Sequence, residues 1–397
     1  MDTMELLTKL QQTEVRYEPI YSANAHVVEG YEISGVLEGA DIDAFLCDDE
    51  VPIEYRVELQ QLIMKKALQQ FKDERLSVDL YMPINPNLFM ADFGESYFAI
   101  IQKYVSEERL HHIVLMMAEH DYCDDIEQLH HAIRYLKTYG VKLCLCNISS
   151  ETHLDYVLLL KPHVLKIDVT MLDYNSWGAN NDLFMTISAL ALRIGSSLLF
   201  HNIETIYHMQ SAWKNGGRYY SGRYLTPPAA AFVEASNLQQ RLHDESVRFI
   251  QAEKKLLKQR FESMRTLQQE LTSIVERCQP KADDEQSLLK LAQALTDYSF
   301  RIYMTDEDGF QVSPNIMRYK EEWLVLENAK HKNWSWRPYF LMNIIKLRHG
   351  KTGELSNVYR DIETGDMTRT FSIELPNHHY LFVDITYDYL YEHKITQ

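Results

Sequence analysis

The sequence is poor in cysteine and in basic residues and has no long apolar run, and each shortage excludes a class of protein. Only five cysteines occur in 397 residues, too few for a disulfide-stapled fold: Cys47, Cys123, Cys144, Cys146 and Cys278. The net charge of −17 argues against a nucleic acid or an anionic membrane as the main partner. No stretch approaches the roughly 18 uninterrupted apolar residues that a membrane span requires, and no signal-peptide pattern is present. We therefore expect a cytoplasmic protein with no membrane span and no nucleic-acid partner.

The first 225 residues alternate short apolar runs with amphipathic helical windows. Such runs are typical of parallel strands buried on both faces, and they occupy residues 77–84, 113–119, 142–148, 164–170 and 197–203. Repeated strand–helix units favour a (β/α) barrel or a doubly wound sheet. In a barrel the chemistry lies at the carboxyl ends of the strands, and this rule selects Glu119, Cys146, Asn147, Lys166, Asp168, Asn202 and Glu204.

The second half of the chain begins with a long helix and then changes character. Residues 229–276 contain no glycine or proline, and an apolar residue recurs at every seventh position, at Ile250, Leu257, Met264 and Leu271. This spacing predicts either a coiled-coil dimer contact or packing against the chain's own domains. After Pro280, alternating strand patterns, glycine turns and one helical window over 337–350 predict an antiparallel α+β domain.

Several segments carry a family resemblance. In the first half these are "GYEISG" (30–35), "AEH" (118–120), "LKID" (165–168), "IE" (203–204) and "NGGRYYSGRYL" (215–225). In their order and spacing they resemble the EAL domain, a barrel phosphodiesterase that opens cyclic di-GMP. "LTDYSFRIYMTDEDG", "NWSWRPYFLMNI" and "DIETGDMTRTFS" resemble the PAS-like C-terminal domain of YkuI-type EAL proteins. The resemblance implies a TIM-like (β/α) barrel over 1–243, a linker helix over 244–280 and a smaller α+β PAS-like domain over 281–397.

Active EAL domains hold two divalent cations, Mg²⁺ or Mn²⁺, through carboxylates and an amide at the barrel mouth. The resemblance implies that this chain retains the family residues at Glu32, Glu119, Lys166, Asp168 and Glu204, of which Lys166 and Glu204 are vestiges of catalysis. It also implies that family ligand positions are occupied by Pro83, Met116, Cys146, Asn147 and His201. Proline, methionine and cysteine offer no oxygen of the kind that Mg²⁺ prefers. We therefore expect no bound metal, no other cofactor and no two-metal hydrolysis.

Two further departures concern the ligand. Val36 stands where the family has an arginine that faces a phosphate, and Ser221 stands where it has a glutamine before the closing glycine. Loss of a charge-assisted contact at Val36 weakens the expected hold on cyclic di-GMP.

Three local patterns have alternative interpretations. Cys144 and Cys146 share one strand face, and we expect small core residues there; the alternative is a zinc site of Glu32, Cys146 and His201. Lys166 and Asp168 are either a catalytic remnant or a buried ion pair, and we favour the ion pair. The aromatic group around Trp334 either lines a ligand pocket or caps the core of the second domain, and the core is the more frequent outcome.

Three hypotheses on function follow, in decreasing order. The first is a non-catalytic EAL signalling module that acts through an unknown protein partner, as a homodimer. The second is a receptor that binds cyclic di-GMP without hydrolysing it. The third is an active cyclic di-GMP phosphodiesterase.

Overall fold

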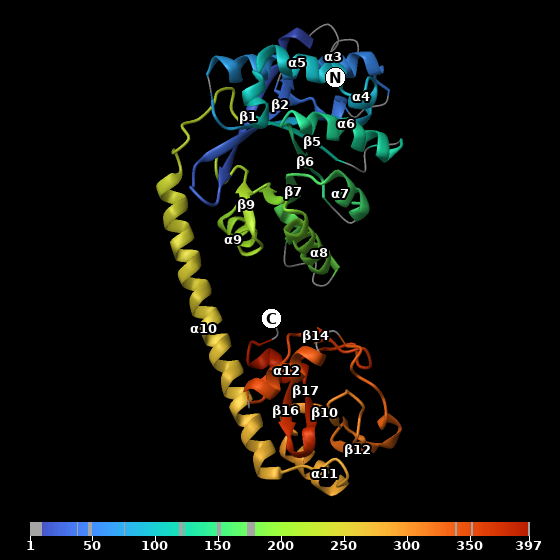
Figure 1. Ribbon diagram of the computed structural model, residues 1–397. Helices are drawn as coiled ribbons and strands as arrows, with labels where there is room; N and C mark the ends of the chain where they lie inside the picture. The colour runs from blue at the N-terminus through green and yellow to red at the C-terminus, as the bar shows by residue number, and fades with distance from the viewer. Residues whose placement is uncertain are drawn as a thin grey trace. The chain divides into compact units, whose positions relative to one another are not determined.

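The apolar runs of the first half form the strands of a closed barrel (Figure 1). The computed structural model describes residues 10–37, 39–46, 50–74, 76–118, 122, 124–148, 152–172, 179–337, 340–350 and 352–395. The barrel strands are β1 (Glu14–Ser22), β2 (Val28–Leu37), β4 (Asp79–Pro83), β5 (Ile113–Met117), β6 (Lys142–Leu145), β7 (Val164–Asp168), β8 (Ser197–His201) and β9 (Gly217–Tyr220). The barrel alternative is therefore confirmed against the doubly wound sheet.

The strand order explains how the barrel closes. The sheet runs β1-β9-β8-β7-β6-β5-β4-β2, with the short β3 (Ala40–Asp41) beyond β2, and β1 also pairs with β2. Strand β1 is antiparallel to both of its neighbours, β2 and β9. From β2 through β9 the neighbouring strands are parallel. The carboxyl ends of β2 and β4–β9 therefore lie at one end of the barrel, which we call the mouth.

Helices follow the parallel strands and cover the outside of the barrel. They are α2 (Asp43–Leu46), α3 (Ile53–Asp73), α4 (Pro86–Met90), α5 (Glu95–Tyr104), α6 (Ile126–Thr138), α7 (Leu154–Leu160), α8 (Ala179–Ile194) and α9 (Ile206–Lys214), with 3₁₀ turns at Leu10–Gln12, Glu107–His112 and Val169–Leu172. Helix α6 shows how the sequence sets such an element. Asp125 caps its first turn by accepting a hydrogen bond from the backbone nitrogen of Glu127, and Leu129, Ile133 and Leu136 face the core.

The barrel interior has a small core of its own. Ile20, Tyr81, Val114, Met116, Cys144, Val164 and Leu199 fill it, and Cys146 packs against this group. Both cysteines therefore face inward, as their spacing predicted, and Cys144 is a buried core residue. Within the described residues, Cys144, Cys146 and Cys278 take part in no disulfide bond, and Cys47 and Cys123 lie outside those residues.

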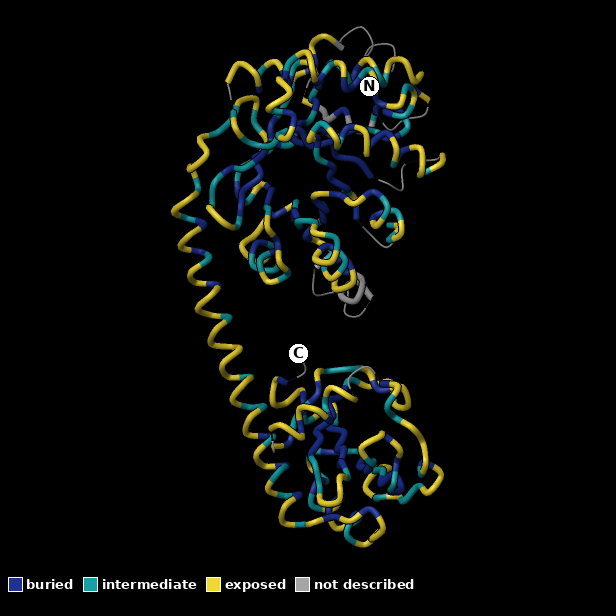
Figure 2. Tube along the Cα trace, in the orientation of Figure 1, coloured by how far each residue is buried: buried dark blue, intermediate teal, exposed yellow. Residues whose placement is uncertain are grey.

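The long helix α10 (Gln239–Cys278) begins ten residues later than the predicted 229. The chain divides into two compact units, Met1–Phe249 and Ile250–Gln397, and the boundary between them falls within α10. In the second unit, Leu267, Leu271 and Val275 of α10 are buried in the core. Ile250 and Leu257 are 36% and 52% exposed, and Figure 2 shows exposed residues along the middle of the helix. The predicted heptad seam thus packs within the chain only in its C-terminal half.

The second unit is α+β, as the sequence predicts. Its six-stranded sheet has the order β12-β11-β10-β17-β16-β13, and β14 and β15 form a separate ribbon. The strands are β10 (Ser299–Thr305), β11 (Asn315–Tyr319), β12 (Glu322–Leu326), β13 (Glu354–Leu355), β14 (Tyr359–Arg360), β15 (Met367–Thr368), β16 (Thr370–Leu375) and β17 (His379–Ile385). The helices are α11 (Glu285–Ala294), α12 (Phe340–Gly350) and α13 (Tyr387–Glu392), with 3₁₀ turns at Glu327–Ala329 and Pro376–His378.

The helices of the second unit bury both faces of its sheet. Ile302 and Val383 face the core that α10 and α11 complete, and Tyr303 and Phe382 face the core that α12 completes. Within the described ranges of the whole chain, no helix is both long and apolar enough to cross a membrane.

Candidate functional site at the barrel mouth

Glu32 on β2 and Lys166 on β7 meet across the interior of the mouth. Lys166 Nζ donates a hydrogen bond to Glu32 Oε1 at 2.6 Å, and the two side chains are only 9% and 15% exposed. Burial by itself lowers the pKa of an ammonium group. Here the attraction of Glu32 outweighs burial, so the pKa of Lys166 lies above its ordinary value and the side chain stays charged. The second oxygen of Glu32, Oε2, is buried and accepts no hydrogen bond in the described part of the chain.

A second carboxyl group, Glu18, lies beside this pair. The antiparallel register of β1 and β2 places Glu18 directly opposite Glu32. Burial, and next the charge of Glu32, raise the pKa of Glu18 to about 7, although Lys166 and Arg223 oppose the rise. Glu18 was not among the predicted site residues, because β1 runs against the other strands and the rule of carboxyl ends does not apply to it. The available signal was a glutamate next to the buried C-terminal half of the strand.

Asp168 does not pair with Lys166, so the predicted ion pair between them is wrong. Its Oδ1 accepts hydrogen bonds from the backbone nitrogen and the hydroxyl of Thr170, at 2.9 and 2.7 Å, and its Oδ2 accepts one from Asn202 Nδ2 at 2.6 Å. These hydrogen bonds hold the pKa of Asp168 below its ordinary value against the opposing effect of burial. Residues 166 and 168 share a strand face, but Lys166 reaches across the barrel to Glu32 instead.

The remaining predicted positions differ in how deeply they lie. His201 ends β8 opposite Asp168, and burial and the charge of Lys166 lower its pKa to about 4, so its imidazole is neutral near pH 7. Asn147 and Glu204 are exposed, and Asn147 has a positive φ of 56° just beyond β6. Glu119 lies outside the described residues.

Comparison with known proteins decides the family of this barrel. Residues 3–228 match the EAL domain, and residues 232–396 match a domain described as an EAL-domain associated signalling protein domain. The chain belongs to the EAL-domain family. The EAL barrel and the YkuI-type C-terminal domain expected from the sequence are both confirmed.

The relatives of this EAL protein include one that matches over its full length. The uncharacterized EAL-domain containing protein YkuI of Bacillus subtilis (strain 168) is 39% identical over 403 residues, which covers 99% of this chain and 98% of the relative. A crystal structure of B. subtilis YkuI, in complex with cyclic di-GMP as substrate and with calcium, has a TM-score of 0.94 at 37% identity and covers 100% of both chains. A cyclic di-GMP complex of the phosphodiesterase PaMucR, 17% identical, covers 55% of this chain and 96% of that one with a TM-score of 0.50, which shows a shared fold alone.

The donor groups of this EAL barrel can be compared with what divalent cations require. Pro83 ends β4, and Met116, next to it in register on β5, is part of the interior core. Neither side chain has an oxygen. Among the residues that the structure describes, no three His, Cys, Asp or Glu side chains are placed to hold a metal ion. Pro83 and Met116 therefore contribute no oxygen ligand to a divalent cation, and the described residues give no support to the alternative zinc site of Glu32, Cys146 and His201.

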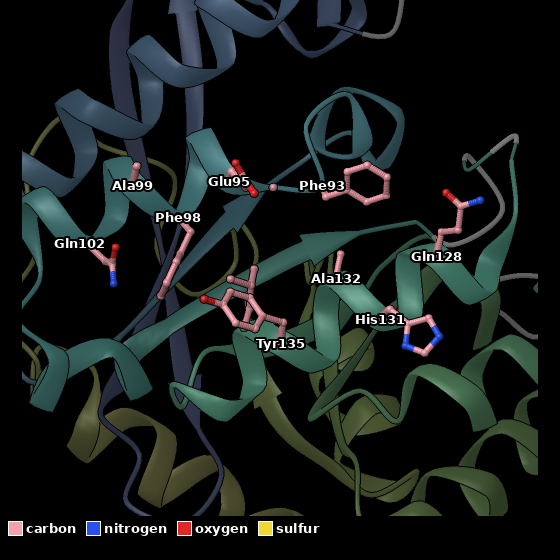
Figure 3. Close-up of a pocket in the computed structure, with 11 residues that line it drawn as sticks. Phe93, Glu95, Phe98, Ala99, Gln102, Gln128, His131, Ala132 and Tyr135 are labelled. Atoms are coloured by element: carbon pink, nitrogen blue, oxygen red, sulfur yellow. The ribbon is translucent and has the colours of Figure 1, made fainter.

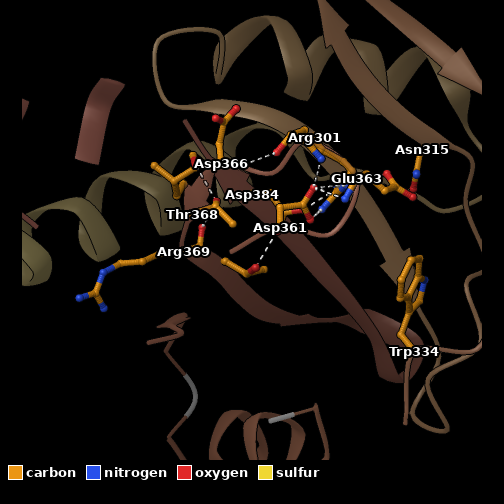
Figure 4. A network of polar contacts seen from close by, with 12 residues as sticks. Arg301, Asn315, Trp334, Asp361, Glu363, Asp366, Thr368, Arg369 and Asp384 are labelled. Carbon is orange, nitrogen blue, oxygen red and sulfur yellow. Dashed lines mark hydrogen bonds and ion pairs between the residues drawn. The ribbon is translucent and has the colours of Figure 1, made fainter. Parts of the chain in front are cut away.

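The C-terminal domain contains a buried network of charges of its own (Figure 4). Arg301 on β10 donates hydrogen bonds to Asp384 Oδ2 and Asp361 Oδ1, each at 2.6 Å, and to Glu363 Oε2 at 2.8 Å. Arg301, Asp361 and Asp384 are almost fully buried. The network ties the turn between β14 and β15 to the six-stranded sheet, and this is a structural role.

The predicted aromatic group in the same domain behaves mainly as core. Trp334 packs against Tyr303 and donates a hydrogen bond from Nε1 to Gln311 Oε1 at 2.8 Å. The guanidinium of Arg337 lies 4.4 Å from the centre of the Trp334 ring, while Trp336 is exposed. These contacts favour the interpretation that Trp334 caps the core.

A groove of about 760 Å³ lies on the outside of the barrel, between α5 and α6 (Figure 3). Phe93, Phe98 and Tyr135 line it, and Phe93 and Tyr135 are largely exposed. None of the charged residues of the mouth lines this groove. It is an apolar surface feature separate from the candidate site.

Proposed function

We propose that this chain is a signalling protein that binds cyclic di-GMP at the mouth of its EAL barrel without hydrolysing it. The observation that carries the proposal is the ion pair between Lys166 and Glu32, at 2.6 Å. The ammonium group of Lys166 donates a hydrogen bond to one of the two carboxylate oxygens of Glu32, the glutamate of the EAL motif. Lys166 thus supplies inside the barrel the positive charge that a metal ion would otherwise bring to Glu32.

Two lines of argument support binding without turnover. Binding is supported by B. subtilis YkuI, a relative with 37% identity over the whole chain whose crystal structure is a complex with cyclic di-GMP. The absence of turnover is supported by Pro83 and Met116, whose side chains lack the oxygens that two-metal hydrolysis requires. The receptor hypothesis therefore now ranks above the pure interaction module.

Calorimetry on the full chain tests this function. Purified protein is titrated with cyclic di-GMP in EDTA and again in millimolar Mg²⁺ or Ca²⁺, and each mixture is analysed for linear dinucleotide by anion-exchange chromatography. Saturable one-site binding with no linear product is the expected result. Metal-dependent turnover would overturn the claim that the barrel does not hydrolyse cyclic di-GMP.

The second candidate function is a protein-interaction module without a nucleotide. The observation in its favour is the groove between α5 and α6, whose exposed Phe93 and Tyr135 offer an apolar surface. No binding of cyclic di-GMP under any of the metal conditions would select this candidate. Both candidate functions share three proposals that come from the sequence. These are a cytoplasmic location, a homodimer, and domain boundaries near residues 243 and 280.

A further inference from the structure

Arg223 is held at the mouth by a backbone arrangement that only glycine permits at the preceding position. Gly222 has a φ of 145°, and a Cβ added there would lie 2.3 Å from the backbone nitrogen of Ile203. The backbone nitrogen of Ile203 donates to the carbonyl oxygen of Ser221 at 3.1 Å, and that of Tyr224 donates to the carbonyl oxygen of Ile203 at 2.9 Å. The backbone on both sides of Arg223 is therefore fixed against the loop that follows β8.

The position of Arg223 relative to the buried acids follows from strand register. Tyr21 on β1 pairs with Tyr220 on the antiparallel strand β9. Three residues back along β1 from Tyr21 is Glu18, and three residues on from Tyr220 is Arg223, so the register brings these two residues toward each other. Consistent with this closeness, the charge of Arg223 lowers the pKa of Glu18. A row of ionisable groups thus crosses the mouth, with Arg223 and Lys166 at its ends and the two acids Glu18 and Glu32 between them.

Arg223 differs from Lys166 and His201, two other basic side chains at the mouth, because it is available to a ligand. Lys166 is buried and bound to Glu32, and His201 is half-buried and uncharged near pH 7. Arg223 is exposed, and its side chain makes no hydrogen bond or short ion pair with any residue in the described ranges. A guanidinium group binds phosphate oxygens well because it presents two parallel N–H donors.

We propose that Arg223 binds a phosphate of the cyclic dinucleotide and so supplies the anion contact that Val36 cannot make. The inference rests on the proposed function, because it requires a phosphodiester at the mouth. The phosphate-binding residue is thereby assigned to the segment just beyond β9, on the other side of β1 from Val36 on β2. Because Arg223 is exposed, this contact needs neither a metal ion nor a rearrangement of Lys166 and Glu32.

The affinity of full-length variants for cyclic di-GMP tests the assignment, measured by calorimetry in EDTA at several salt concentrations. Arg223→Ala should raise the Kd at least tenfold and reduce the slope of log Kd against log salt, since one charge contact with phosphate is lost. Arg223→Lys should keep the salt slope and lose only part of the affinity. Arg218→Ala is the matched control, because Arg218 is an exposed arginine on β9, five residues before Arg223, and it lies against Tyr219. The Kd of this variant should equal that of the wild type.

The outcomes separate this inference from the proposed function. If the wild type binds and Arg223→Ala binds with the same Kd and salt slope, the assignment of Arg223 is wrong while the receptor function stands. If the wild type does not bind at all, both fail. Circular dichroism confirms that each variant is folded, and Arg223→Gln replaces the alanine variant if that one does not fold.

Discussion

Lys166 and Glu32 form a buried ion pair between β7 and β2, two strands that are not neighbours in the barrel. The pair crosses the interior, with a 2.6 Å hydrogen bond, above a core that contains Met116 and Cys144. A buried pair of this kind adds little net stability, because desolvation offsets the attraction. Removing one partner is costly, however, since the other is left as an uncompensated buried charge.

The first prediction therefore concerns Lys166→Met. Loss of the ammonium group leaves Glu32 beside Glu18 without a counter-ion, and we expect the free energy of unfolding to fall by about 3–5 kcal/mol at pH 8. Urea denaturation followed by circular dichroism measures this change. The double variant Lys166→Met/Glu32→Gln should recover a large part of the loss, because it removes the stranded charge. Equal losses in the single and the double variant would contradict an energetic coupling between the two residues.

The second prediction concerns the pH dependence that Glu18 brings. With its pKa raised to about 7, Glu18 is protonated in the folded chain at pH values where it is ionised in the unfolded chain. The folded state then binds the extra proton, so the contribution of Glu18 to stability falls as the pH rises from about 4.5 to about 7. Glu18→Gln lacks this dependence. The free energy of unfolding of Glu18→Gln minus that of the wild type should therefore increase by about 3 kcal/mol between pH 4.5 and pH 8.

Urea titrations at several pH values measure the difference between the Glu18 variant and the wild type. Glu14→Gln, at the exposed start of the same strand, removes a charge without a buried environment and serves as the control. A constant difference between wild type and Glu18→Gln across the pH range would show that Glu18 keeps its ordinary pKa.

The mouth also shows which features of the site could be predicted from the sequence and which could not. The strands and the inward direction of Cys144 and Cys146 follow from local periodicity, which depends only on neighbouring residues. Periodicity left the barrel and the doubly wound sheet open, and the family resemblance favoured the barrel. The partner of Lys166 was predicted wrongly because the same rule of alternation makes Asp168 a neighbour. The actual partner, Glu32, comes from 134 positions away in the chain and is brought there by closure of the barrel. Glu18 was missed for the same reason, since its place depends on the reversed direction of β1.

The third prediction concerns the charge network of the C-terminal domain. Arg301→Met leaves Asp361 and Asp384, which are both buried, without their cation. We expect the domain to lose about 3–5 kcal/mol of stability, and the turn between β14 and β15 to lose its anchor. Hydrogen exchange of the full chain, read by mass spectrometry, should show faster exchange of the amides of residues 359–368.

Arg348→Ala is the control for this network. Arg348 also pairs with a carboxylate, Glu307, but both side chains are about half exposed. Such surface pairs contribute at most about 1 kcal/mol. If both arginine variants changed exchange of residues 359–368 to the same small extent, the buried network would not anchor this turn.

The fourth prediction concerns the middle of α10. Ile250, Leu257 and Phe261 are 36%, 52% and 66% exposed, and they lie along one side of the helix at steps of seven and four residues. The spacing of Leu257 and Phe261 with Met264 is that of a coiled-coil seam, so we expect a second copy of the helix to cover this stripe. Leu257→Glu/Phe261→Glu should convert a dimer into a monomer in analytical ultracentrifugation at micromolar concentration.

Gln251→Glu/Gln259→Glu is the control, because it adds the same charge at exposed polar positions of the same helix and should leave the dimer intact. A wild-type monomer, or a dimer that survives the changes at Leu257 and Phe261, would show that the stripe is not the dimer contact.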